Sequence, residues 1–214
     1  MLGVGKLGPA VGVIDIGGFS NIRSVTAAIA RAGGRPVIVD DARSLAGLGA
    51  LVLPGAGSFG SFIAAMAKQS WRERLRDAVL GADASLLGIC LGLQVLMDVG
   101  EESGAQAGLG LLKGRARRLQ AGANRLPHIG WTTVDVPIGS PVLMSGVTAG
   151  LDFYFLHSFC VDPIDSACVT AWATFGERFP AVVERGRVMG TQFHPEKSSR
   201  AGMRLLENFV SHAQ

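Results

Sequence analysis

The residue whose setting first suggests chemistry is Cys90, in the stretch GICLGLQ (88–94). Packing alone would favour leucine, valine or alanine inside this apolar run. Glycines two residues to either side are typical of a nucleophile elbow, a sharp turn from a strand into a helix, because small residues relieve the crowding there. The spacing therefore predicts a thiol nucleophile at Cys90. A free cysteine buried as a small apolar side chain is the competing interpretation.

A histidine and a carboxylate stand close together in the stretch GTQFHPEKS (190–198). Pro195, between them, keeps the backbone extended and prevents a preceding strand from continuing its ladder. His194 is then placed to point at a nucleophile, with Glu196 orienting and charging the imidazole, as in a catalytic triad. The competing interpretation is a surface turn with a solvated histidine and glutamate.

A third stretch, PGAGSFG (54–60), follows a buried apolar run. Gly55 and Gly57 allow backbone N–H groups to turn towards a bound ligand. Together with the N–H of Leu91, directly after the proposed nucleophile, these groups are suited to form an oxyanion hole.

The elements that must position these residues alternate between strands and helices. Short apolar runs predict strands over residues 10–15, 35–40, 49–57 and 84–90. Apolar periodicity predicts helices over residues 22–32 and 61–80, and a further helix directly after Cys90. This alternation is typical of a parallel sheet in an α/β layer architecture, in which reactive groups collect at the carboxyl ends of the strands.

After about residue 109 the pattern changes to successive β-type runs. Residues 184–187 predict a hairpin turn, and an amphipathic helix is expected over residues 198–213. No linker or repeat interrupts the chain, so we expect one domain over residues 1–214, with residues 1–9 as a short N-terminal tail.

Composition narrows the class of protein. The 214 residues are 48% hydrophobic and 17% charged, with a net charge of +3, which is typical of a globular protein. The basic residues form no long run, so nucleic acid is not indicated; their densest group is a solvated face or a site for an acidic or phosphate-rich partner. That group comprises Lys113, Arg115, Arg117, Arg118 and Arg125.

The three cysteines and the absence of a long apolar segment indicate the cellular compartment of the protein. Their odd number and spacing favour a reducing compartment and predict no metal site. The N-terminus does not resemble a signal peptide, and the longest apolar stretch, residues 85–97, is too short to span a bilayer. We expect a cytoplasmic protein that has no membrane partner.

Taken in order, the stretches PGAGSF, GICLGLQ, HIGW, YFLHSF and QFHPEKS resemble the class I (triad) glutamine amidotransferases. Within that superfamily they are most similar to the glutaminase subunits of imidazole glycerol phosphate synthase, in histidine biosynthesis. The resemblance extends from about Val11 to the C-terminal helix. It implies a flavodoxin-like three-layer sandwich, with a mostly parallel central sheet and added antiparallel strands.

The resemblance implies a Cys90-His194-Glu196 triad that hydrolyses L-glutamine to glutamate and ammonia through a cysteine thioester, without a cofactor or metal. Gln94 lies one helical turn beyond Cys90 and Glu102 would meet the α-ammonium group of the substrate. The implied oxyanion-hole and substrate-binding set is Gly55, Ala56, Gly57, Leu91, Gln94, Glu102, His157 and Ser158, with His157 contributing its backbone.

The resemblance also implies a partner. In this family ammonia passes to a (β/α)₈-barrel cyclase subunit, in a heterodimer that makes imidazole glycerol phosphate and aminoimidazole carboxamide ribotide. Asn21, Trp131 and Lys197 would face that partner. Thr132 replaces the usual asparagine, and the first loop, DIGGFSNI (15–22), is one residue longer than usual. His128 is expected to be structural or interfacial.

Three other functions remain open from the sequence. Because the first loop is altered, one alternative is a paralogous amidotransferase that supplies ammonia to an enzyme of surface-sugar biosynthesis. A catalytically silent docking subunit would retain the fold without activity. A general cysteine hydrolase or protease would not require the glutamine-pocket motifs.

Overall fold

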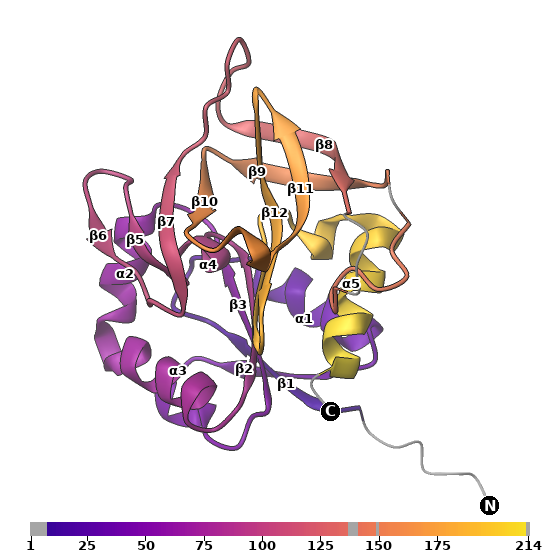
Figure 1. The fold of residues 1–214 in the computed structure, drawn as a ribbon. Coiled ribbons are helices and arrows are strands. Elements are labelled where there is room, and N and C mark those ends of the chain that lie inside the picture. Colours follow the sequence, from indigo (N-terminus) through magenta and orange to yellow (C-terminus); the bar gives the residue numbers. More distant parts are fainter. Residues whose placement is uncertain (1–7, 137–140, 149, 213–214) are drawn as a thin grey trace, which may run out of the picture.

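The computed structural model of the chain describes residues 8–136, 141–148 and 150–212. The tail expected over residues 1–9 therefore lies largely outside the described residues. Nine strands form one sheet in the order β2-β1-β3-β4-β13-β12-β11-β8-β9, and four more form a second sheet in the order β10-β7-β5-β6 (Figure 1).

Five strands at one end of the large sheet run parallel to one another. They are β2 (Arg35–Val39), β1 (Ala10–Ile14), β3 (Ala50–Gly55), β4 (Ser85–Cys90) and β13 (Val188–Thr191). β3 and β4 are buried along their whole length, as expected for strands that are covered on both faces. The predicted strand positions are confirmed.

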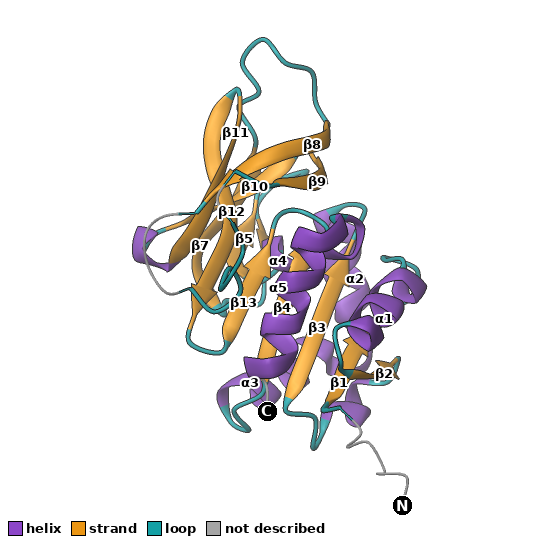
Figure 2. Cartoon of the chain, turned by 90° about the vertical axis from the view of Figure 1, so that its right-hand side faces the viewer, coloured by secondary structure: helices purple, strands orange, loops and turns teal. Residues whose placement is uncertain are grey.

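Antiparallel strands extend the large sheet beyond β13 and form one end of the molecule (Figure 2). They are β12 (Glu177–Arg185), β11 (Val169–Phe175), β8 (His128–Asp135) and β9 (Asp152–His157). β12 and β13 form the predicted hairpin.

Helices α1 (Ile22–Arg31) and α5 (Ser199–His212) lie side by side (Figure 1) and share a hydrophobic cluster with the large sheet. A second cluster joins α2 (Phe59–Met66) and α3 (Trp71–Leu80) to the sheet and to the small second sheet. This second sheet consists of β10 (Phe159–Pro163), β7 (Leu112–Arg118), β5 (Met97–Gly100) and β6 (Gln106–Ala107).

The prediction of a single helix over residues 61–80 is wrong. Gln69 and Ser70 have φ angles of 60° and 55°, and a left-handed backbone cannot continue a right-handed helix. The segment is therefore divided into α2 and α3, and each helix buries its own aromatic residues: Phe62 in α2 and Trp71 in α3.

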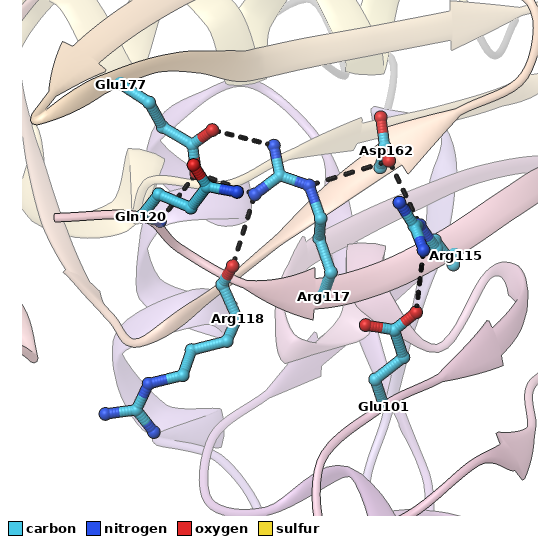
Figure 3. Close-up of polar contacts among 7 residues, drawn as sticks. All are labelled: Glu101, Arg115, Arg117, Arg118, Gln120, Asp162 and Glu177. Carbon is cyan, nitrogen blue, oxygen red and sulfur yellow. Dashed lines mark hydrogen bonds and ion pairs between the residues drawn. The ribbon is translucent and has the colours of Figure 1, made fainter.

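Three residues of the dense basic group, Lys113, Arg115 and Arg117, form ion pairs with carboxylates of the same chain. Arg115 contacts Glu101 at 3.0 Å and Asp162 at 3.1 Å, and Arg117 contacts Glu177 at 2.6 Å (Figure 3). These carboxylates neutralise much of the positive charge of β7. The basic residues are therefore better explained as a solvated face of the protein than as a phosphate-binding site. Across the described ranges, no helix combines the length and apolarity required to cross a membrane.

Candidate active site

Cys90 ends β4 in a strained backbone conformation, with φ 55° and ψ −110°. The short helix α4 (Leu91–Gln94) begins at the next residue. A Cβ atom on Gly88 would lie 2.7 Å from the nitrogen of Leu93, and one on Gly92 would overlap the carbonyl oxygen of Leu53. Both glycines are therefore sterically required for the sharp turn. The structure has the geometry of the predicted nucleophile elbow.

β3 lies against this elbow because Gly55 also lacks a side chain. A Cβ atom at Gly55 would lie 2.7 Å from the nitrogen of Gly92. The chain then turns at Gly57, which has a φ of 98°. The N–H of Ala56 donates to the carbonyl of Phe19 at 2.6 Å, so it is available to an oxyanion only when this hydrogen bond opens.

His194 and Glu196 are coupled directly. Nδ1 of His194 lies 2.8 Å from Oε1 of Glu196, and the two side chains are 9% and 4% exposed. The backbone around them is held against β9: the N–H of His194 donates to the carbonyl of Tyr154 at 2.9 Å. Ser198 donates its hydroxyl to the His194 carbonyl at 2.6 Å and accepts from the Tyr154 N–H at 3.0 Å.

The charge state of His194 follows from its neighbours. Burial lowers the pKa of this imidazole, but hydrogen bonding and charge from Cys90 and Glu196 outweigh burial and raise the pKa to about 10. His194 therefore carries a proton at neutral pH, and both Cys90 and Glu196 favour this charged form. An imidazolium of this kind stabilises a thiolate.

A pocket of about 250 Å³ opens over the sulfur and brings together residues that are far apart in the chain. Ten of the predicted site residues line it: Ala56, Gly57, Cys90, Leu91, Gln94, Glu102, His157, Ser158, His194 and Lys197. Gly55 instead lines a neighbouring pocket of about 430 Å³, together with Asn21 and Glu196. The two pockets share four lining residues: Ala56, Gly57, His194 and Lys197.

Gln192 is a further residue of the site that was not predicted from the sequence. This side chain is fully buried, and its Nε2 lies 3.7 Å from the sulfur of Cys90, while its Oε1 accepts from Nε2 of Gln94 at 3.3 Å. Nε2 of Gln94 also donates to the carbonyl of Phe159 at 2.8 Å. The signal that was available is an amide side chain directly after the predicted strand, two positions before His194.

Two further predicted residues have structural partners within the site. Oε2 of Glu102 accepts from the N–H of Phe59 at 2.6 Å, at the start of α2. Nδ1 of His157 lies 2.9 Å from the carbonyl of Phe159. Burial lowers the pKa of His157 to about 3, so its ring is neutral at physiological pH.

Of the residues predicted to face a partner, Asn21 and Lys197 line the second pocket, and Trp131 lies near Lys197 through the ring of Tyr154. Trp131 is 52% exposed, and its β-strand neighbour Ile129 is also exposed. Nζ of Lys197 lies 5.8 Å from the centre of the Tyr154 ring, which itself packs edge-to-face against Trp131. Asn21 is exposed and caps α1 by accepting from the N–H of Ser24 at 3.2 Å.

No group of three histidine, cysteine, aspartate or glutamate side chains suitable for a metal occurs in the part of the chain that the structure describes. The proposed chemistry depends on a thiol, an imidazolium and a carboxylate, which supply a nucleophile and an acid–base group without a metal.

Comparisons with known proteins identify the fold and the family of the chain. The family model for glutamine amidotransferase class-I matches residues 14–213. A crystal structure of a glutamine amidotransferase superposes with a TM-score of 0.74 at 22% identity, covering 95% of this chain and 98% of that one. The structure of PurLQS from Thermotoga maritima gives a TM-score of 0.76 at 21% identity, covering 97% and 100%. The chain belongs to the class I glutamine amidotransferases, and the predicted fold class is confirmed.

Relatives with higher sequence identity show to which family within this class the chain belongs. The imidazole glycerol phosphate synthase subunit HisH of Moorella thermoacetica is 39% identical, over 95% of this chain and 96% of its own. The HisH subunit of Symbiobacterium thermophilum is 41% identical over 92% and 91%, and that of Halobacterium salinarum is 41% identical over 98% and 96%. Within its class, the chain belongs to the HisH family.

Proposed function

We propose that this chain is the glutaminase subunit of imidazole glycerol phosphate synthase, with Cys90, His194 and Glu196 as its catalytic triad. The observation that carries the assignment of the triad is the shared pocket: a strained cysteine and a protonated histidine line it, and the histidine contacts a buried carboxylate at 2.8 Å. The substrate is L-glutamine, and the product ammonia serves histidine biosynthesis.

In the first half of the reaction the Cys90 thiolate attacks the side-chain carbonyl carbon of glutamine. The carbonyl electron pair moves to oxygen and forms a tetrahedral oxyanion, which backbone N–H groups near Gly57 and Leu91 stabilise. When this intermediate collapses, the C–N bond breaks and the His194 imidazolium gives its proton to the leaving nitrogen. Ammonia leaves, and a glutamyl thioester remains on Cys90.

In the second half of the reaction a water oxygen attacks the thioester carbonyl, and the neutral His194 accepts a proton from that water molecule. The C–S bond breaks, glutamate leaves, and the thiolate–imidazolium pair is restored. Glu196 holds the imidazole ring in place through Nδ1 and stabilises its positive charge in both halves.

The pocket contains groups that suit a glutamine molecule. Glu102 supplies a negative charge for its α-ammonium group, and Gln94 and the backbone of His157 and Ser158 supply polar contacts along the wall. No structural observation favours a surface-sugar pathway or a general protease, and the intact triad argues against a silent docking subunit.

We also propose that the edge of the sheet formed by β8 and β9 faces the (β/α)₈-barrel cyclase subunit in a heterodimer. The exposed apolar side chains of Ile129, Trp131 and Leu156 support this, since contiguous exposed apolar groups mark interaction surfaces. Asn21 and Lys197, also predicted to face the partner, both line the second pocket of about 430 Å³. In this proposal residues 1–214 act as one glutaminase domain in the cytoplasm.

Replacement of the nucleophile tests the function. In the complex with the cyclase subunit, Cys90→Ala should abolish glutamine-dependent synthesis of imidazole glycerol phosphate, because no thioester can form. Synthesis from added ammonium salt should continue at the wild-type rate, because the cyclase needs only ammonia. Both rates are measured by product formation under identical conditions.

The matched control is Cys168→Ser, which changes another buried cysteine outside the pocket and should leave both rates unchanged. Loss of both activities in Cys90→Ala would show that Cys90 supports docking or folding and not catalysis. Retained glutamine-dependent synthesis would refute the proposed nucleophile.

A further inference from the structure

The rings of two buried histidines, His157 in the wall of the proposed glutamine pocket and His128 beside it, have no role in the reaction described above. His128 in β8 and His157 in β9 are directly opposite each other in the strand register and are 1% and 5% exposed. Nδ1 of His128 lies 3.0 Å from Nε2 of His157. Rings of Phe155 and Phe175 stack on His128, with ring-centre distances of 5.0 Å and 4.0 Å.

The hydrogen-bond partners determine which ring nitrogens carry protons. The Phe159 carbonyl can only accept, so Nδ1 of His157 is the donor across 2.9 Å. Burial keeps both rings neutral, lowering the pKa of His157 to about 3 and that of His128 to about 4. Nε2 of His157 must therefore accept from Nδ1–H of His128. The remaining nitrogen, Nε2 of His128, accepts from the hydroxyl of Thr132 at 2.7 Å.

The inner end of this series of hydrogen bonds reaches the substrate pocket. The Phe159 carbonyl accepts from both His157 and Nε2 of Gln94, the latter at 2.8 Å. Nε2 of Gln94 also donates to Oε1 of Gln192 at 3.3 Å, so both of its protons are used. The amide of Gln94 is thereby oriented with its oxygen, an acceptor, as the end available to a ligand in the pocket.

We propose that Thr132, His128 and His157 form a positioning relay that fixes the Phe159 carbonyl and, through it, the orientation of the Gln94 amide towards glutamine. The relay runs from Thr132 on β8 to the pocket wall, and each group in it has a single hydrogen-bonding direction. It rests on the proposed function in one respect, that the ligand recognised by Gln94 is glutamine. Neither Thr132 nor His128 touches the substrate; both act through His157.

Substitution of His128 separates the hydrogen bond from the packing. His128→Phe retains an aromatic ring for stacking but removes the donor to His157. We expect the KM for glutamine to rise about five- to tenfold with kcat changed less than twofold, the loss typical of one buried hydrogen bond. His128→Asn, whose amide nitrogen can replace Nδ1, should restore most of the affinity. Rates are measured in the complex with the cyclase subunit.

The matched control is Phe175→Leu, which removes a stacked ring and leaves all relay atoms in place. Its KM for glutamine should stay within twofold of wild type. A KM shift in Phe175→Leu equal to that of His128→Phe, or no rescue by His128→Asn, would overturn the relay in favour of a packing role. Thr132→Val, which alters only the outer end of the relay, should raise the KM in the same direction.

A measurement independent of turnover distinguishes failure of the relay from failure of the proposed function. ¹⁵N NMR of the full chain should show Nδ1 protonated and Nε2 unprotonated in both His128 and His157 between pH 6 and about pH 8. The opposite tautomer of either ring would refute the relay, even if the enzyme hydrolyses glutamine. A correct tautomer pattern in a chain that neither binds nor hydrolyses glutamine in the complex with the cyclase subunit would refute the proposed function and leave the hydrogen-bond directions intact.

Discussion

At the scale of single residues, the ring of His194 is the group whose charge depends most on its neighbours. Burial alone would keep this imidazole neutral, as it does for His128 and His157. The difference is the nearby sulfur of Cys90 together with the buried carboxylate of Glu196, which both raise the pKa of His194. Oε2 of Glu196 is buried without a hydrogen-bond partner among the described residues, so this carboxylate acts on His194 through Oε1 and through its charge.

Glu196→Gln should therefore change the pH dependence of glutamine hydrolysis as well as its rate. Because the pKa of His194 is raised to about 10 in the wild type, its proton is present at neutral pH and is lost only as the pH rises through that value. Removing the carboxylate charge lowers this pKa, so the alkaline limb of the kcat profile should move to lower pH. The kcat at pH 7 should fall by about 10²-fold, as expected for loss of an orienting acid–base partner.

The control is Glu207→Gln, which changes a carboxylate on α5 that is 43% exposed. Its pH profile should match that of the wild type. An alkaline limb that does not move in Glu196→Gln would contradict the view that the Glu196 carboxylate contributes to the raised pKa of His194.

At the scale of elements, the junction of β4 and α4 was predictable because its cause is local. Gly88, Cys90 and Gly92 lie within five consecutive positions, and their spacing alone indicates the turn. The division of residues 61–80 was not predictable in the same way. Apolar periodicity continues through both α2 and α3, and the left-handed residues Gln69 and Ser70 carry no glycine signal.

Gly92→Ala tests the steric requirement at the elbow. The added Cβ would overlap the carbonyl oxygen of Leu53, a backbone atom in the buried strand β3 that cannot move freely. We expect the free energy of unfolding to fall by about 2–4 kcal/mol, measured by urea denaturation.

Gly49→Ala is the matched control, because nothing lies within 4 Å of its Cβ position. Its stability should stay within about 0.5 kcal/mol of wild type. A Gly92→Ala chain as stable as the wild type would mean that the elbow tolerates a side chain and that its geometry is not set by this contact.

At the scale of the whole molecule, ion pairs connect the small second sheet to the large one. Arg117 in β7 makes two hydrogen bonds to Glu177 in β12, at 2.6 Å and 2.9 Å (Figure 3), and both side chains are largely buried. Glu177 also accepts from the N–H of Gln120 at 2.6 Å. Arg115 forms comparable pairs nearby, but its side chain is 50% exposed.

Arg117→Met should lower the free energy of unfolding by about 1–3 kcal/mol at pH 7, because it removes charge-assisted hydrogen bonds from a largely buried carboxylate. Hydrogen bonding to Arg117 lowers the pKa of Glu177 in the folded state. The contribution is therefore present above the usual pKa of a glutamate and is lost as the pH falls through the lowered value. Thermal unfolding should therefore show a smaller difference in stability between Arg117→Met and the wild type at acid pH than at pH 7.

Arg115→Met, at an exposed pair, should change stability by less than about 0.5 kcal/mol. Equal effects of the two substitutions would contradict the view that the buried pair, and not surface charge in general, connects the two sheets.

Local features could be predicted from the sequence alone: the buried parallel strands, the elbow at Cys90, the hairpin before Val188, and the residue types of the triad. These follow from periodicity and steric rules that act between neighbouring residues. The tertiary structure decided which distant residues meet: Gln192 and Cys90, 102 positions apart, and the two histidines opposite each other in β8 and β9. Such contacts depend on strand order and register, which bring together side chains that no short stretch of sequence contains.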